Sequence, residues 1–264
     1  PSTATPEATV TKTATAMPSA TPTEAPTATA TAIPEAERVF VPILCYHYIR
    51  EYQEADSEDD RAYVTPPGLL DEQLSWLKEN GYTGVTAPQV YDYLINGKAL
   101  PPKPIMLSFD DNQGSQYTDA LPLLTKYGFN ATFFIMTVTI DKENFMSAEQ
   151  LKDLDAKGFD IEAHTWDHHM VTQYTEEDNN IQLVQPKKTL EDLLGHPVKF
   201  FAYPFGVYDG PSAQNVEKAG YVGAFSLREV MDDTVKPQYA IKRYITNSYW
   251  TMDQFEQVVT GQWE

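Results

Sequence analysis

Short apolar segments alternate with longer amphipathic segments from about residue 41 to the end of the chain. The short segments are rich in β-branched and aromatic residues and are mostly apolar on both faces, which is typical of strands buried in a parallel sheet. This pattern predicts strands at Val41–His47, Tyr82–Thr86, Pro104–Asp111, Asn130–Met136, Phe159–His164, Lys199–Tyr203, Val222–Ser226 and Ala240–Ile245.

The amphipathic segments carry apolar residues at helical spacing. Leu69, Leu70, Leu74 and Leu77, for example, fall on one face of such a segment. Pro122 and Pro186 lie inside two other segments, where they predict a kink or a break. The expected helices are Leu69–Glu79, Pro88–Ile95, Tyr117–Tyr127, Ser147–Lys157, Glu176–Leu194, Pro211–Ala219 and Met252–Val259.

The alternation of strands and helices predicts an α/β fold whose parallel sheet is closed, or nearly closed, into a barrel. An open doubly wound sheet is the alternative. No glycine-rich phosphate loop follows the first strand, which argues against nucleotide binding. The acidic segment Arg50–Thr65 lacks periodicity, and we expect it to be a surface loop near the barrel mouth.

Residues 1–38 differ in composition from the rest of the chain. They consist almost entirely of Thr, Ala, Pro, Ser and Glu, and they contain no aromatic residue and no glycine. Such a segment buries too little apolar surface to offset its ordering entropy. We therefore expect a disordered stalk or linker, or a tail that acts only as a spacer, followed by one globular domain at residues 39–264.

The net charge of −19 argues against nucleic acid as a partner, because the phosphates would be repelled. It is compatible with a neutral or cationic ligand, or with solubility alone. The single cysteine, Cys45, excludes an intrachain disulfide, and no segment is apolar and long enough to span a bilayer. Because the chain starts at Pro1 and a Thr/Pro/Ala-rich segment precedes the domain, we expect export, with secretion or attachment to the cell surface through the stalk.

Two adjacent carboxylates, Asp110 and Asp111, end the third predicted strand. In a parallel barrel the active site forms at the carboxyl ends of the strands. A pair of acids at the end of an apolar strand is costly to bury unless a cation or a proton compensates it. The alternative is that the pair caps the helix that follows.

Two imidazoles, His164 and His168, follow the fifth predicted strand at a spacing that lets both grip one metal ion. Such a pair can also be incidental. Since the two acids lie at a neighbouring strand end, one Asp and two His would form a facial set for Zn²⁺ or a similar divalent ion. His169 follows directly and is expected to point elsewhere.

Three motifs resemble those of the polysaccharide deacetylases, also known as carbohydrate esterase family 4 or the NodB homology domain. They are Ser108-Phe109-Asp110-Asp111, His164-Thr165-Trp166-Asp167-His168 and Phe201-Ala202-Tyr203-Pro204-Phe205-Gly206, and the resemblance covers most of residues 39–263. It implies a distorted (β/α)₇ barrel. It also implies that Asp111, His164 and His168 bind the metal, that Asp110 is the general base, and that the backbone N–H of Phe205 completes an oxyanion site.

Two positions depart from the family pattern. Asn112 stands where the first motif usually has glycine, and Ala202 stands where the third motif usually has the arginine that holds the base. Arg243 is our first candidate to replace that arginine and Arg228 our second, although either could be an ordinary surface charge.

The opening strand resembles that of an exported branch of the family, which includes deacetylases of poly-N-acetylglucosamine. In that branch an early histidine is the general acid, which here would be His47, unless it only packs in the core. The resemblance implies an N-acetylglucosamine polymer as substrate. We expect the divalent metal to be Zn²⁺, or else Co²⁺ or Ni²⁺, and we expect the protein to be a monomer. Trp166 and Tyr203 could stack on sugar rings, or pack in the core. The alternatives are a non-catalytic glycan-binding domain, and an esterase or small-amide hydrolase on the same fold.

Overall fold

The computed structural model describes residues 32–228 and 232–262, so the predicted stalk lies outside the described residues except for its last part. The compact unit starts at Ala32. Ile33 N donates to the carbonyl of Gly97 at 2.7 Å, and the Arg38 guanidinium donates to the carbonyl of Leu94. Residues 32–38, which we assigned to the stalk, are therefore attached to the globular domain.

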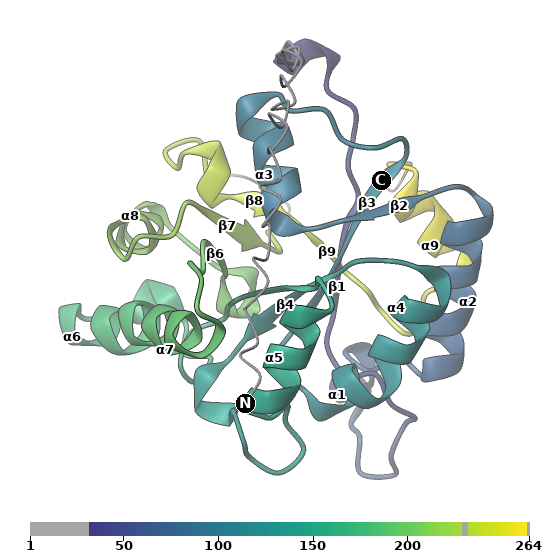
Figure 1. The fold of residues 1–264 in the computed structure, drawn as a ribbon, viewed down its shortest axis with the longest axis horizontal. Coiled ribbons are helices and arrows are strands. Elements are labelled where there is room, and N and C mark those ends of the chain that lie inside the picture. The colour runs from purple at the N-terminus through teal and green to yellow at the C-terminus, as the bar shows by residue number, and fades with distance from the viewer. Residues whose placement is uncertain (1–31, 229–231, 263–264) are drawn as a thin grey trace, which may run out of the picture. The chain divides into compact units, whose positions relative to one another are not determined.

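Every paired strand in the sheet is parallel to its neighbour, as the apolar strand pattern predicts (Figure 1). The spatial order is β8-β7-β6-β5-β4-β3-β1-β9, with β2 paired to β3. The strands are β1 (Ile43–Tyr46), β2 (Thr83–Val85), β3 (Pro104–Asp110), β4 (Thr132–Ile135), β5 (Asp160–Ala163), β6 (Phe200–Ala202), β7 (Gly223–Ser226), β8 (Ile241–Lys242) and β9 (Tyr244–Ile245).

The last predicted strand, Ala240–Ile245, is divided at Arg243, and this break joins the two ends of the sheet. β8 pairs with β7, and β9 pairs with β1. The N–H of Arg243 donates to the carbonyl of Ser226 at 2.8 Å, and that of Thr246 donates to the carbonyl of Cys45 at 2.9 Å. The result is a nearly closed α/β barrel, as expected, in place of an open sheet.

The helices are arranged around the outside of the sheet, apart from α3 at one end (Figure 1). They are α1 (Glu58–Ala62), α2 (Pro67–Glu79), α3 (Ala87–Asn96), α4 (Leu121–Tyr127), α5 (Ala148–Ala156), α6 (Glu176–Asn179), α7 (Gln185–Leu194), α8 (Gly210–Lys218) and α9 (Met252–Val259). Short 3₁₀ turns lie at Glu35–Glu37, Thr137–Thr139, Val171–Gln173, Pro204–Gly206 and Pro237–Tyr239. None of the helices in the described ranges combines the length and apolarity that a bilayer crossing needs.

Proline interrupts two predicted helices as expected. A π-helical turn at Gln116–Ala120 precedes α4, which has Pro122 in its first turn. A second π-helical turn at Asn180–Val184 separates α6 from α7, which has Pro186 in its first turn. Since proline has no N–H to donate backwards, the preceding turn widens and the regular α-helix restarts at the ring.

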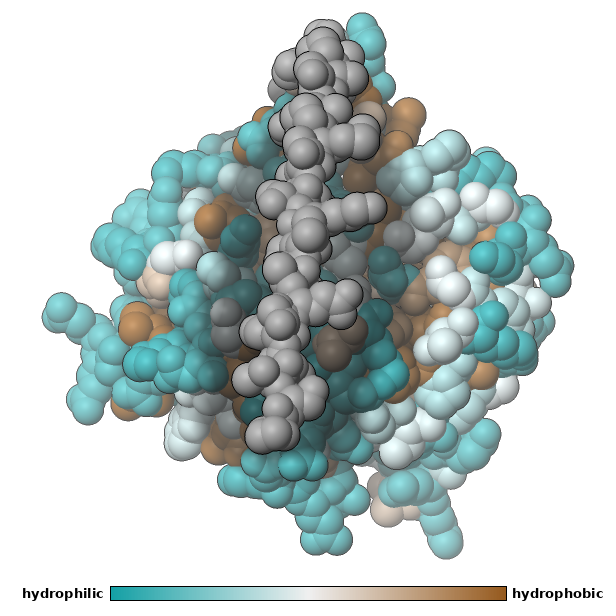
Figure 2. Space-filling model, viewed as in Figure 1, coloured by the Kyte–Doolittle hydropathy of each residue, from teal (hydrophilic) through white to brown (hydrophobic). Residues whose placement is uncertain are grey.

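Buried side chains alternate between two faces of the closed sheet. Leu107 and Phe133 join a large cluster with Leu74 of α2, between the sheet and the outer helices. Met106 and Phe134 face the other way, into the barrel. In Figure 2 hydrophilic residues make up most of the outline of the molecule, which agrees with helices that turn their apolar faces inward.

The segment Arg50–Thr65, predicted to be a loop throughout, contains the short helix α1. Ser57 caps it, since its hydroxyl accepts from Asp60 N and the Asp60 carboxylate accepts from Ser57 N in return. The prediction of a surface loop therefore missed this short helix. A single turn with no buried residue has no apolar periodicity to reveal it.

Candidate active site

The candidate residues meet where the strands end. Asp110 is the last residue of β3, His164 follows β5 and His47 follows β1. Adjacent strand residues point to opposite faces, yet Asp110 and Asp111 both reach one pocket. Asp111 has φ of 76°, so a left-handed turn redirects its side chain. His168 and Phe205, with φ of 69° and 57°, are also left-handed, so backbone strain is concentrated at this site.

Asp111, His164 and His168 form a set that fits a divalent cation. Asp111 Oδ1 lies 3.4 Å from His164 Nε2 and 3.7 Å from His168 Nε2. Ligand atoms on a tetrahedral ion with bonds near 2 Å are about 3.3 Å apart. Asp111 Oδ1 and His164 Nε2 are buried and have no hydrogen-bond partner among the described residues. Buried polar atoms are seldom left unpaired, so the two atoms fit the role of ligands to a cation.

The partner of the other His164 nitrogen selects the tautomer that a metal ligand needs. Nδ1 lies 2.8 Å from the carbonyl oxygen of Ala202 and can only donate to it, which leaves Nε2 as a free lone pair. Burial alone would lower the pKa of His164, but Asp110 and Asp111 outweigh it and raise that pKa. Burial and the charge on His164 lower the pKa of His168 to about 4. The pKa values of the two imidazoles are therefore shifted in opposite directions.

Asp110 does not belong to this ligand set, because Arg243 holds it. The two terminal nitrogens of Arg243 lie 2.7 Å from the two carboxylate oxygens, and one of them also donates to Ser108 Oγ at 3.1 Å. Both side chains are buried. Burial would raise the pKa of Asp110, but the charge of Arg243 outweighs it, so the pKa lies well below its usual value. Arg228, our second candidate, instead donates to the backbone carbonyl of Tyr208.

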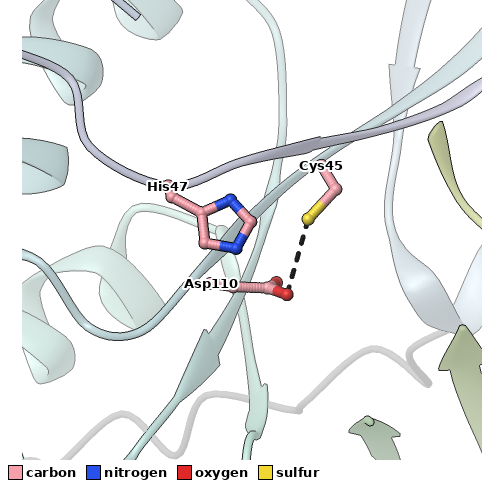
Figure 3. A group of neighbouring side chains, drawn as sticks. All are labelled: Cys45, His47 and Asp110. Carbon is pink, nitrogen blue, oxygen red and sulfur yellow. Dashed lines mark hydrogen bonds between the residues drawn. The ribbon is translucent and has the colours of Figure 1, made fainter. Parts of the chain in front are cut away.

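Cys45, His47 and Asp110 form a second group with metal-ligand spacing (Figure 3). Unlike the first group, this one has no unpaired carboxylate oxygen to offer a cation, because both oxygens of Asp110 accept hydrogen bonds from Arg243. Burial raises the pKa of the Cys45 thiol well above its usual value, so the sulfur keeps its proton and donates to Asp110 Oδ2 at 3.4 Å. His47 is therefore left facing the carboxylate without a metal role.

The pocket around these groups has a volume of about 300 Å³. The sequence analysis did not identify four of the residues that line it, namely Tyr48, Asp60, Tyr63 and Leu227. Tyr48, Asp60 and Tyr63 come from the segment that follows β1, and the Tyr63 ring contacts the His47 ring edge-on at 5.1 Å. Burial lowers the pKa of His47, although Asp111 and Asp110 partly offset this. The only sequence signal was the position of this acidic segment next to the expected barrel mouth.

The remaining predicted residues differ in exposure. Phe205 lines the pocket, is 56% exposed and packs its ring against that of His168 at 4.5 Å. Tyr203 lines the same pocket, but its side chain is buried and its hydroxyl donates to the carbonyl of Tyr239. Trp166 is 41% exposed and does not line the pocket. His169 pairs with Asp167 and points away, as expected for a non-ligand.

The chain is similar in sequence to known proteins. Residues 97–224 match the family model described as polysaccharide deacetylase. The poly-β-1,6-N-acetyl-D-glucosamine N-deacetylase of Staphylococcus aureus is 27% identical over 242 residues, which cover 82% of this chain and 80% of that protein. YxkH of Bacillus subtilis is 29% identical over 181 residues, which cover 69% of this chain but only 62% of YxkH.

The fold is also similar to solved structures. The crystal structure of BC0361, a polysaccharide deacetylase from Bacillus cereus, superposes with a TM-score of 0.72 at 27% identity, and the match covers 83% of this chain and 68% of that one. The likeness therefore extends well beyond the residues of the pocket.

Proposed function

The chain belongs to the polysaccharide deacetylase family, and we propose that it is a metal-dependent hydrolase that removes N-acetyl groups from a polymer containing N-acetylglucosamine. The observation that carries the proposal is the unpaired, buried pair of Asp111 Oδ1 and His164 Nε2 beside the arginine-held Asp110, in one pocket. The similarity to an N-deacetylase of a β-1,6-linked polymer supports the substrate class.

We assign the cation site to Asp111, His164 and His168, and we favour Zn²⁺, since one carboxylate and two imidazoles are a donor set typical of catalytic zinc. Co²⁺ and Ni²⁺ are the alternatives. When bound, the ion would polarise the acetamide carbonyl and acidify a water molecule.

Asp110 is the proposed general base. The attacking water must lose a proton, and Asp110 is ionised because Arg243 compensates its charge. The bidentate contact also fixes the carboxylate plane, so the proton acceptor is held in one orientation. Ala202 stands at the position of the family arginine, and we assign that arginine's role to Arg243, at the break between β8 and β9.

His47 is the proposed general acid. An amine is a poor leaving group unless it is protonated, and His47 lines the pocket beside Asp110 and Asp111. Burial lowers the pKa of His47, and the two carboxylates offset part of that effect. The backbone N–H of Phe205, in its left-handed turn, is the proposed donor to the developing oxyanion.

The test is acetate release from β-1,6-linked and β-1,4-linked N-acetylglucosamine oligomers. We expect release that stops with a chelator and returns with Zn²⁺, Co²⁺ or Ni²⁺. Oligomer binding without acetate release under all three metals would instead favour a glycan-binding domain. Release from small acetyl esters but from no oligomer would favour an esterase.

We also propose that the protein is a monomer that acts outside the cell, free or attached to the surface through residues 1–31, which lie outside the described part of the chain. The polymer named for the Staphylococcus aureus relative supports a substrate that is met extracellularly. Cell fractionation and light scattering on the purified protein test these two points.

A further inference from the structure

A second groove, of about 690 Å³, opens beside the active-site pocket. The two hollows share one wall, because Tyr48 lines both. Gln113 lines the groove and lies two residues after Asp111, so the groove starts close to the proposed cation site. We call this hollow the amide groove, after the side chains of Gln53, Gln113, Asn144 and Gln150 that line it together with Thr118 and Phe145.

The amide groove and the pocket differ in charge. Three carboxylates, those of Asp60, Asp110 and Asp111, line the pocket. Of the described residues that line the groove none is acidic, although the protein carries a net charge of −19. The one charged residue in the groove is Arg50, which is paired through both terminal nitrogens with Asp56 at 2.8 Å.

The side-chain NH₂ group of Gln150 is a hydrogen-bond donor in the groove with a fixed orientation. Its Oε1 accepts from the backbone N–H of Ser147 at 2.8 Å and so closes the capping box of α5. This bond fixes the amide plane and leaves the NH₂ group without a recorded partner in the described structure. Phe145 adds an apolar surface of the kind on which a sugar ring can stack.

We propose that the amide groove binds the sugar next to the one that is hydrolysed, and that it selects a neighbour that still carries its N-acetyl group. The inference rests on the proposed function. Amides and hydroxyls complement the neutral hydroxyl and acetamide groups of such a sugar. A glucosamine neighbour would bring an ammonium group next to amide donors, and no described residue lining the groove offers a carboxylate to pair it, which is unfavourable.

Calorimetric binding to the metal-free protein tests the proposal without reference to turnover. The probes are a β-1,6-linked N-acetylglucosamine tetramer and its singly deacetylated isomers. We expect the isomer with glucosamine in the groove to bind about fivefold more weakly, which corresponds to the loss of one hydrogen bond. Gln150→Glu keeps the capping box but replaces the donor with a carboxylate, so it should weaken binding of the acetylated tetramer about fivefold and narrow or reverse the preference.

Gln89→Glu is the matched control. Gln89 occupies the same capping-box position in α3, with its Oε1 accepting from Thr86 N, and it lines neither hollow. It should bind like the parent protein. Asn144→Asp offers a second, nearly isosteric carboxylate in the groove at a left-handed position that Asp tolerates, and it should shift the preference in the same direction.

The outcomes separate the two proposals. If the parent protein and both groove variants bind all the tetramers with equal affinity, the proposal for the amide groove is refuted. The deacetylase proposal still holds in that case if the parent protein releases acetate. Tighter binding of the fully acetylated tetramer, with a preference that both Gln150→Glu and Asn144→Asp reduce, supports the amide groove. If the parent protein shows this preference but releases no acetate with any metal, only the deacetylase proposal fails.

Discussion

Arg243 and Asp110 are 133 positions apart in the sequence, yet their side chains form two parallel hydrogen bonds of 2.7 Å inside the barrel. Arg243 lies at the break between β8, which pairs with β7, and β9, which pairs with β1. Its guanidinium also lies over the ring of Phe134 at 5.0 Å. The same residue therefore lies at the closure of the sheet and holds the carboxylate that we assign as the base.

Replacing Arg243 should impair both stability and catalysis. Arg243→Met leaves Asp110 buried without its partner, which should cost about 3–5 kcal/mol in the free energy of unfolding. Arg243→Lys keeps the charge but loses the bidentate geometry, and we expect kcat to fall about tenfold or more. Denaturant unfolding and acetate-release kinetics measure the two effects. Arg228→Lys is the control and should stay within about twofold; full activity in Arg243→Lys would refute the assignment.

Replacing His168 should abolish metal binding. His168→Asn suits the left-handed backbone at that position and removes one of three ligands, so affinity for Zn²⁺ should fall at least about 100-fold. Metal titration by calorimetry provides the measurement. His169→Asn, one residue along and 73% exposed, should bind as the parent does. Similar losses in both variants would show that the effect is not that of a ligand.

The role of His47 can be tested by the leaving group. His47→Gln should lower amide hydrolysis about 100-fold or more, because the amine must be protonated as it leaves. Hydrolysis of an aryl acetate should fall far less, since phenolate leaves without a proton. His196→Gln, at an exposed histidine bound to Asp155, is the control. Equal losses on both substrates would indicate that His47 only shapes the pocket.

Cys45 should react with thiol reagents only when the protein unfolds. The residue is completely buried, and burial raises its pKa well above the usual value. Labelling rates followed against denaturant should therefore track global unfolding. Because the thiol donates to Asp110, Cys45→Ala should lower kcat a few-fold, whereas Cys45→Ser, which keeps a donor, should lose less.

The contribution of Asp160, on β5, to stability should fall as the pH rises toward 6. Burial raises the pKa of this carboxyl to about 6, although Thr132 donates a hydrogen bond to it. Its pKa is higher folded than unfolded, so its contribution to stability is complete below about pH 4 and is lost as the pH passes the folded value. We expect this contribution to fall by about 3 kcal/mol between pH 4 and 8, measured as the difference between the parent protein and Asp160→Asn.

Asp160→Asn should remove most of that pH dependence, because the amide oxygen can still accept from Thr132. Asp192→Asn, at an exposed acid paired with Lys188, should leave the pH profile as it is. The measurement is the free energy of unfolding of the parent protein and of both variants between pH 4 and 8. If the stability of Asp160→Asn changes with pH as that of the parent protein does, Asp160 is not the titrating group.

Local sequence was enough to predict the strands and the helix that contains Pro186. Buried parallel strands are apolar runs of limited length, and helices show their period over two or three turns, so both signals lie within one window of the chain. The proximity of Asp111, His164 and His168 was also predictable. Asp111 and His164 each follow a strand directly, and parallel strands bring their carboxyl ends to one side.

Contacts between distant segments could not be predicted from spacing. The sequence identified Arg243 as a candidate only because Ala202 left a role open, and it did not separate Arg243 from Arg228. Tyr48 and Asp60 were missed because a short, polar segment carries no periodicity that would direct it over the pocket.

The sequence by itself determined the alternation of strands and helices, the positions of Asp110, Asp111 and His164 at strand ends, and the family that their motifs resemble. Only the tertiary structure decided that Arg243 meets Asp110, that Cys45 donates to the same carboxylate, and that Tyr48 separates two hollows of unlike charge. The physical reason is that closure of the sheet fixes which strands become neighbours. Pairing of β9 with β1 joins residues about 200 positions apart, and no local pattern records that pairing.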